Sequence, residues 1–138
     1  MVQVNLDSLI EQAADLVCDS RRLVVFTGAG VSTESGIPDF RSPGGIWSKY
    51  DPEDFTISKI VSDREFRRKI LQMGDFVFRD AQPNPAHYAI AEIEKMGKLD
   101  RLITQNVDNL HQMAGNSSGR ILELHGNMRE AVCLSSHR

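Results

Sequence analysis

The chain has 138 residues, of which 41% are hydrophobic and 25% are charged, with a formal net charge of −3. This composition is typical of one globular domain and excludes disordered and collagen-like chains, and the small negative charge gives no general attraction to nucleic acid or to an anionic membrane. No apolar run approaches the roughly 20 residues that cross a bilayer, the N-terminal segment lacks the pattern of a signal peptide, and two cysteines do not form a disulfide framework, so we expect a cytoplasmic protein without membrane or nucleic-acid partners.

Two elements are predicted ahead of a glycine-rich stretch. Apolar residues at helical spacing predict an amphipathic helix over residues 6–17 that packs on a sheet, with Cys18 buried near its end. Residues 23–26 are mostly β-branched or aromatic and predict a strand buried on both faces.

The strand leads into Gly28-Ala29-Gly30, where small residues let backbone N–H groups approach an anion at the start of a helix. The spacing of the two glycines is that of a dinucleotide-binding fingerprint, but Thr33 stands where the third glycine belongs. The stretch is therefore either a phosphate cradle or a tight turn in an ordinary α/β domain.

Residues 36–47 contain prolines and glycines together with Phe40 and Trp47, and they predict an ordered or conditionally ordered loop. One interpretation is a cover over the phosphate site, and the other is a surface loop packed on its own aromatic side chains. Arg41 either pairs with a phosphate or carboxylate group or is solvated.

The remaining pattern alternates helices and strands. Helices are predicted over residues 58–80, from Asn84-Pro85 to Gly97, and up to residue 115, with strands over 101–104 and 121–124. This order predicts an α/β fold with a parallel sheet. The connection between the first two strands is about 75 residues long where a plain crossover needs a dozen or more, so residues 44–80 are interpreted as an inserted small helical subdomain.

Polar residues follow the three predicted strands, at sheet ends that should lie side by side. They are the glycine turn, the segment Gln105-Asn106-Val107-Asp108, and His125. His125 is the candidate general base, Gln105 and Asn106 can bind ribose hydroxyls or orient water, and Asp108 can accept from an amide such as that of nicotinamide. The alternatives are that Asn106 and Asp108 cap the next helix and that His125 is structural.

The chain resembles the sirtuin family over nearly its whole length, in four motifs with the right order and spacing. The motifs are Gly28-Ala29-Gly30-Val31-Ser32, Gly36-Ile37-Pro38-Asp39-Phe40-Arg41, Gln105-Asn106-Val107-Asp108 and Leu124-His125-Gly126. The resemblance implies a Rossmann-like sheet and an NAD-dependent protein-lysine deacylase, which acts on an acyl-lysine protein or peptide and produces nicotinamide, O-acyl-ADP-ribose and free lysine.

The resemblance also implies roles for individual residues. His125 would be the general base on a ribose hydroxyl, Asn106 a second catalytic residue, and Phe40 a shield for the reactive ribose carbon. The residues implied to hold NAD are Gly28, Ala29, Gly30, Ser32, Pro38, Asp39, Phe40, Arg41, Gln105, Asn106, Val107 and Asp108. Sirtuins that remove succinyl groups resemble one another in a Tyr-x-x-Arg motif where this chain has Leu71 and Gly74, so uncharged acyl groups are favoured.

Two departures from the family pattern shape the expected domain organisation. A sirtuin sheet has about six strands and this sequence predicts three, so residues 1–43 and 81–130 are expected to form part of a Rossmann-like unit whose uncovered edge can self-associate. Residues 131–138 would begin an incomplete zinc-binding module, in which Cys133 is a ligand but Ser136 replaces the second cysteine. Zinc is therefore not expected in this chain alone.

Three functions remain open from the sequence. The first is the deacylase, the second is an inactive sirtuin-like fragment that acts at most as a binding module, and the third is NAD-dependent mono-ADP-ribosyl transfer.

Overall fold

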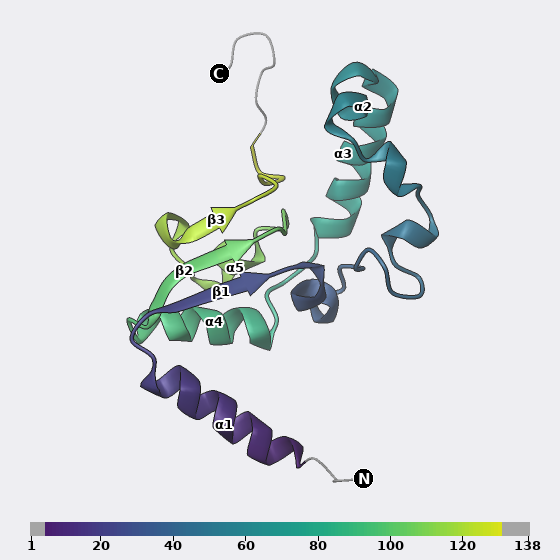
Figure 1. Cartoon of the computed structure of the whole chain (residues 1–138). Coiled ribbons are helices and arrows are strands. Elements are labelled where there is room, and N and C mark those ends of the chain that lie inside the picture. Colours follow the sequence, from purple (N-terminus) through teal and green to yellow (C-terminus); the bar gives the residue numbers. More distant parts are fainter. Residues whose placement is uncertain (1–4, 131–138) are drawn as a thin grey trace.

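The centre of the molecule is a three-stranded parallel sheet in the order β1-β2-β3, seen in a computed structural model that describes residues 5–130 (Figure 1). The strands are β1 (Leu23–Thr27), β2 (Leu99–Thr104) and β3 (Ile121–Glu123). Thr27 pairs with Thr104, which in turn pairs with Glu123, so all three strands end at the same edge. The predicted α/β fold with a parallel sheet is confirmed, and the three polar segments that follow the strands start side by side.

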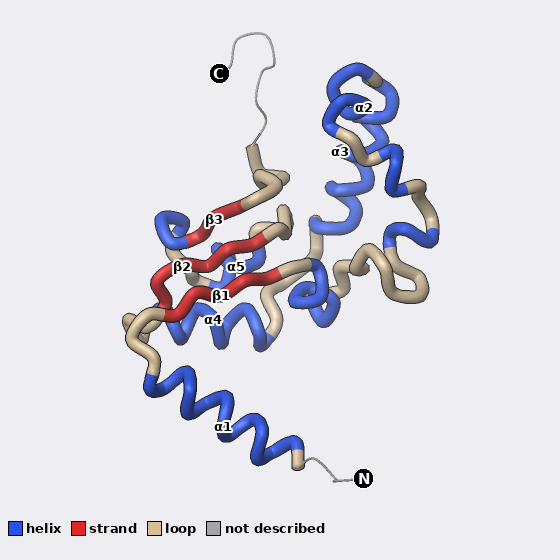
Figure 2. Tube along the Cα trace, in the orientation of Figure 1, coloured by secondary structure: helices blue, strands red, loops and turns tan. Residues whose placement is uncertain are grey.

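One face of the sheet carries the core. Helices α4 (Pro85–Lys95) and α5 (Leu110–Ala114) lie together on this face (Figure 2) and pack against each other. Ile90 of α4 contacts Leu99 and Leu102 of β2. Both leucines are fully buried, and burial of one such side chain contributes about 1.5–3 kcal/mol. The predicted start and end of α4 are confirmed, since Asn84 caps the helix and Gly97 adopts a positive φ of 72° just after it.

The other face is open in the described part of the chain, and the prediction that β1 is buried on both faces is wrong. Val24 and Phe26 point to the open face with exposed fractions of 57% and 61%. Phe26 pairs with Ile103, which pairs with Leu122, so an apolar row crosses this face. An apolar run predicts that both faces of a strand avoid water. It does not show whether another element of the fold is present to cover each face.

Helix α1 (Leu6–Asp19) forms close to where the periodicity predicts, but it does not pack on the sheet. It extends away from β1 (Figure 1) and has no buried residue, and Cys18 is exposed rather than buried. The apolar stripe predicted one water-avoiding side of a helix correctly, but periodicity does not identify the surface that covers it.

The predicted helix over residues 58–80 is two helices, α2 (Ile57–Ser62) and α3 (Arg64–Phe78), which stand apart from the sheet (Figure 1). Asp63 separates them because its carboxylate accepts from Phe66 N at 2.9 Å and caps α3. Arg67 then donates to the carbonyl oxygens of Ile60 and Val61 at the end of α2, at 2.8 Å each. A side chain that competes with the helical backbone explains the break.

Apolar and aromatic packing joins this helical pair to the rest of the fold. Val77 and Phe78 of α3 pack on a small buried cluster formed by Ile37, Ala81 and Leu110. A series of aromatic rings runs from the loop into α3, with centroid separations of 5.0 Å from Phe40 to Trp47, 5.0 Å from Trp47 to Phe55 and 5.8 Å from Phe55 to Phe66. Among the described residues, no helix is long and apolar enough to cross a membrane.

Candidate functional site

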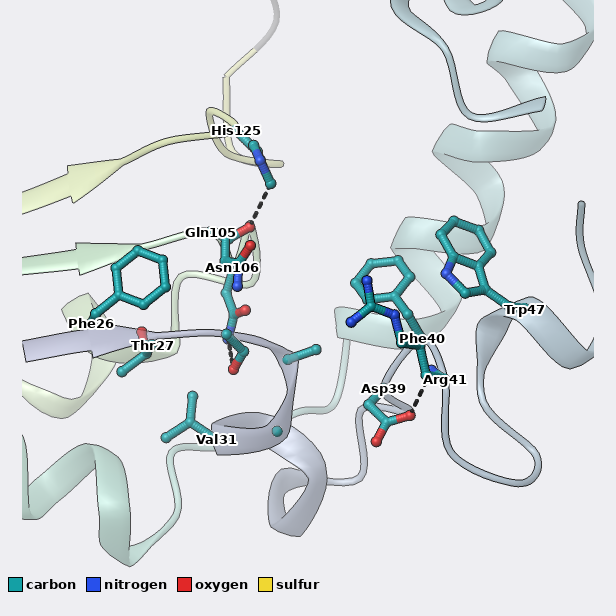
Figure 3. A pocket seen from close by; sticks show the side chains of 13 residues that line it. Phe26, Thr27, Val31, Asp39, Phe40, Arg41, Trp47, Gln105, Asn106 and His125 are labelled. Carbon is teal, nitrogen blue, oxygen red and sulfur yellow. Dashed lines mark hydrogen bonds between the residues drawn. The ribbon is translucent and has the colours of Figure 1, made fainter. Parts of the chain in front are cut away.

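A pocket of about 740 Å³ lies at the carboxyl ends of the strands (Figure 3). One side is formed by the ends of β1 and β2 and by His125 after β3, and the other side by the loop that carries Phe40, Arg41 and Trp47. The lining residues are Phe26, Thr27, Gly28, Ala29, Gly30, Val31, Asp39, Phe40, Arg41, Trp47, Gln105, Asn106 and His125. Ligands of open parallel sheets bind at this edge, so the fold places the pocket where a ligand is expected.

The glycine turn forms the floor beside β1. Gly28 follows the last residue of β1, and a short 3₁₀ helix (Ala29–Ser35) begins directly after it, closed by a bond from Val31 N to Gly28 O at 3.0 Å. A Cβ atom on Gly28 would lie 2.7 Å from Nε2 of Gln105, whereas one on Gly30 would meet nothing within 4 Å. Gly28 therefore allows Gln105 to cross the strand end, and Gly30 leaves the pocket side of the turn open.

The loop wall is held by its own hydrogen bonds. Asp39 accepts from the backbone N–H groups of Arg41 at 3.1 Å and Ser42 at 2.8 Å, and the side-chain and backbone bonds from Ser42 lower the pKa of its carboxyl. Backbone bonds from Ile46 N to Asp39 O at 2.8 Å and from Trp47 N to Phe40 O at 2.9 Å close the loop. The segment is thus ordered and packed on its aromatic residues while it also covers one side of the pocket.

His125 has a defined tautomer. Its Nδ1 lies 3.1 Å from the carbonyl oxygen of Gln105 (Figure 3), and a carbonyl oxygen can only accept. In the neutral ring the proton is therefore on Nδ1, and Nε2 carries the lone pair. This is the arrangement that a neutral general base needs.

Asn106 is held at both its side chain and its backbone. The side-chain Nδ2 donates to Gly28 O at 3.1 Å and to Ser32 Oγ at 3.2 Å, and the backbone N–H donates to Thr104 Oγ1 at 3.0 Å. Because the carbonyl of Gly28 fixes which amide atom is nitrogen and both side-chain hydrogens are donated, Oδ1 is the atom left to interact with a ligand.

A buried chain of polar side chains lies beneath this floor. Asn84 N–H donates to Nδ1 of His87 at 3.3 Å, which puts the ring proton on Nε2, 3.5 Å from Ser32 Oγ. Ser32, fully buried, donates in turn to Oδ2 of Asp108 at 2.7 Å. Burial lowers the pKa of His87, against an opposing effect of Asp108, so the ring stays neutral.

The residues predicted for cofactor binding fall into two groups. Eight line the pocket together with the predicted base His125: Gly28, Ala29, Gly30, Asp39, Phe40, Arg41, Gln105 and Asn106. Ser32 and Asp108 lie beneath it, and Pro38 lines a second hollow of about 450 Å³ formed largely by the loop itself. The carbonyl of Val107 accepts from Met128 N at 3.2 Å. Asp108 also accepts from Leu110 N at 3.0 Å, so the predicted helix-start role is present as well.

The metal prediction is not tested by this structure. Cys133 and Ser136 lie outside the described residues, and residues 5–130 contain no group of three or more side chains that could hold a metal ion.

Sequence reasoning missed several residues of the site. Thr27 and Val31 flank the predicted glycine turn, and their position next to it could have identified them. Phe26 and Trp47 also line the pocket, although the sequence predicts a core residue for Phe26 and a loop residue for Trp47. His87 and His111, whose ring centroids are 4.8 Å apart, were missed because they lie on different helices and only the fold brings them together.

Comparisons with known proteins agree with this geometry. A model of the Sir2 family matches residues 28–138. The NAD-dependent protein deacylase 2 of Archaeoglobus fulgidus is 51% identical over 134 residues, which are 96% of this chain and 51% of that protein. The NAD-dependent protein deacetylase 2 of Caldanaerobacter subterraneus is 50% identical over 133 residues, which are 92% of this chain and 51% of that protein.

Solved structures show the same relationship. A Sir2 protein in complex with a p53 peptide and NAD⁺ superposes with a TM-score of 0.80 and 40% identity, over 94% of this chain and 50% of that chain. The chain thus spans about half the length of the curated relatives and solved chains that it matches.

Proposed function

The chain belongs to the Sir2 family, as its sirtuin motifs indicated, and on this basis we propose that its pocket serves the NAD-dependent removal of acyl groups from protein lysine side chains. The observation that carries the proposal is that one pocket brings together the open glycine turn, the Asn106 amide and the ring of His125. The contact of Nδ1 with the carbonyl oxygen of Gln105 leaves Nε2 of the neutral ring as the acceptor.

The residues present fit NAD. The turn at Gly28–Gly30 leaves room for a phosphate group beside backbone N–H groups, Arg41 supplies a cation on the opposite wall, and Gln105 and Asn106 offer amides to a ribose. NAD supplies an ADP-ribosyl group with nicotinamide as the leaving group.

The chain's own residues would then transfer a proton and control the access of water to the pocket. His125 would accept a proton at Nε2 from a hydroxyl group in the pocket and would become a cation that keeps its Nδ1–H bond to Gln105 O. Oδ1 of Asn106 would orient a hydroxyl or a water molecule, and Phe40, packed on Trp47, would exclude water from the reacting carbon.

The proposed substrate is an uncharged acyl-lysine in a protein or peptide. The related protein bound to a p53 peptide supports a peptide substrate. The side-chain atoms nearest to Gly74 belong to Met128 and Phe78, and Met128 reaches so close that a Cβ on Gly74 would lie 2.5 Å from its Cε. Leu71 and Gly74 offer neither a hydroxyl group nor a cation to an acidic acyl group, which favours acetyl or longer uncharged chains over a carboxylate.

Calorimetric titration of the 138-residue chain with NAD, combined with nicotinamide release from an acetyl-lysine peptide, tests the proposal. We expect binding, and release that His125→Ala abolishes and Lys95→Ala, an exposed control on α4, leaves intact. If nicotinamide is released while ADP-ribose is transferred to a peptide that keeps its acetyl group, mono-ADP-ribosyl transfer is favoured instead. Binding without any release would favour a binding module.

A further inference from the structure

We propose that Thr104, Thr27 and His111 form a buried hydrogen-bonded chain that positions Asn106. The chain begins at the Asn106 N–H, which donates to Thr104 Oγ1 at 3.0 Å. Thr27 Oγ1 donates to the same oxygen at 2.9 Å, and Nε2 of His111 lies 2.9 Å from Thr27 Oγ1. The inference rests on the proposed function for the task of Asn106, whereas the contacts themselves do not depend on it.

The fold explains why these side chains meet. Thr27 and Thr104 are directly paired neighbours at the ends of β1 and β2, and their side chains point to the face that α5 covers. His111 lies in α5 and reaches this pair from below. Through His111 and Thr27, helix α5 is thereby linked to the ends of both strands, where the polypeptide reaches the pocket.

The direction of the hydrogen bonds is consistent along the chain. With the hydroxyl hydrogen of Thr27 directed toward Thr104, the matching tautomer of His111 carries its proton on Nε2 and donates to Thr27. Nδ1 of His111 is buried and has no hydrogen-bond partner in the described residues, so Nε2 is the ring atom that links α5 to the two threonines. Burial and the neighbouring His87 lower the pKa of His111 to about 4, so the ring is neutral at physiological pH.

Burial makes the chain a rigid support. The exposed fractions of Thr27, Thr104 and His111 are 7%, 3% and 1%, so water does not compete for these bonds. The Asn106 side chain is held from the other side by Gly28 O and Ser32 Oγ. Two independent attachments fix Oδ1 of Asn106 with respect to the pocket, and displacements of about 1 Å in such groups are costly to catalysis.

Residue-resolved amide hydrogen exchange of the 138-residue chain tests the proposal without any need for activity. Thr104→Val removes the acceptor at nearly constant volume, and Thr104→Ser retains it. We expect the Asn106 amide to exchange about tenfold faster in Thr104→Val, roughly the factor for the net loss of one hydrogen bond, and at the original rate in Thr104→Ser. Thr27→Val, with Thr27→Ser as its control, gives the same readout should Thr104→Val not fold.

The amide of Gln105 is the internal reference, because it donates to Thr27 O at 3.2 Å in the sheet ladder. A selective change at Asn106 supports the proposal. An unchanged Asn106 rate in Thr104→Val overturns it, and so does an equal acceleration at Gln105, which would mean general fraying of the strand end. Replacement of His111 by leucine should accelerate the Asn106 amide more than His111→Gln does, since glutamine can still donate to Thr27.

Turnover provides a second readout. In an active chain we expect Thr104→Val to lower kcat with little change in KM for NAD, and Thr104→Ser to restore kcat. An unchanged kcat alongside a freely exchanging Asn106 amide overturns the positioning role. Inactivity of the unsubstituted chain contradicts the proposed function instead, and the exchange rates still decide whether Thr104 holds Asn106.

Discussion

Nδ1 of His125 and the carbonyl oxygen of Gln105, 3.1 Å apart, set the chemistry of the pocket, because this contact leaves Nε2 of the ring as an acceptor. Gln105 follows β2 and His125 follows β3, and these strands are neighbours in the sheet. The orientation of the proposed base is therefore a product of the parallel strand pairing rather than of any residue close to it in the sequence.

His125→Ala is expected to lower the rate of NAD-dependent turnover by about 10²- to 10⁴-fold, the range for loss of a general base. NAD affinity should change little, since the ring lies at one end of the pocket and the turn and loop remain. Steady-state kinetics and calorimetry measure the two quantities separately. A large loss of affinity with an intact rate would assign His125 to binding instead.

Gly28→Ala is expected to weaken NAD binding while it changes the free energy of unfolding little. The added Cβ would lie 2.7 Å from the far end of the Gln105 side chain, which can rotate away, but the displaced amide then leaves its place in the pocket. In a Gln105→Ala background the same substitution should have a much smaller effect on affinity. Equal losses of affinity in both backgrounds would place the effect in the turn itself.

Ser32→Ala is expected to lower the free energy of unfolding by about 1–3 kcal/mol, because it leaves Asp108 and the Asn106 amide without their buried partner. Thr33→Ala is the matched control, since Thr33 is exposed and its hydroxyl bonds only to the nearby Gly30 carbonyl at 2.9 Å. Urea denaturation compares them. A Ser32 variant as stable as the Thr33 variant would mean that the buried chain contributes no net stability.

Acidification is expected to destabilise the fold before most carboxylates titrate. His111 has a pKa of about 4 in the fold and an ordinary value of 6.5 when unfolded, so between these values the unfolded chain binds the additional proton. The free energy of unfolding is fully retained above pH 6.5 and should fall by up to about 1.4 kcal/mol per pH unit as the pH decreases through this window. His111→Gln should reduce the slope, with the part due to His87 remaining; an unaltered slope would contradict this assignment.

The open face of the sheet is expected to drive self-association of this chain. Val24 and Leu122 expose 57% and 53% of their surfaces there, and both are apolar. Sedimentation velocity should show concentration-dependent oligomers that the double variant Val24→Lys/Leu122→Lys disperses. Arg101 shares this region of the sheet, and Arg101→Lys is a control that keeps the charge. A monomer at all concentrations would refute the prediction.

The position of the site was predictable because its parts end strands. Short apolar runs that alternate with helical segments locate β1, β2 and β3, and parallel pairing then brings Gly28, Asn106 and His125 to one edge without any structure. The support beneath the site was not predictable in the same way. Ser32 reaches Asp108 across 76 positions and Thr27 reaches His111 across 84, and no local pattern encodes such contacts.

Layer assignments failed for a different reason. Hydrophobic periodicity in α1 and the apolar run of β1 identify surfaces that avoid water, but burial depends on a second surface that must be present. A local contact explains the other wrong prediction, the single helix over residues 58–80. The helical pattern continues on both sides of Asp63, but the carboxylate of Asp63 accepts from Phe66 N and starts a new helix there.

The aromatic series from Phe40 to Phe66 gives the molecule a built-in optical probe. Trp47 is the single tryptophan of the chain, and it lies in the pocket wall between the ring of Phe40 and that of Phe55. Tryptophan fluorescence of the protein therefore originates at the loop that faces the glycine turn. Any molecule that enters the pocket, or any shift of α3 carried through Phe55, will register as a change in the emission of one indole ring.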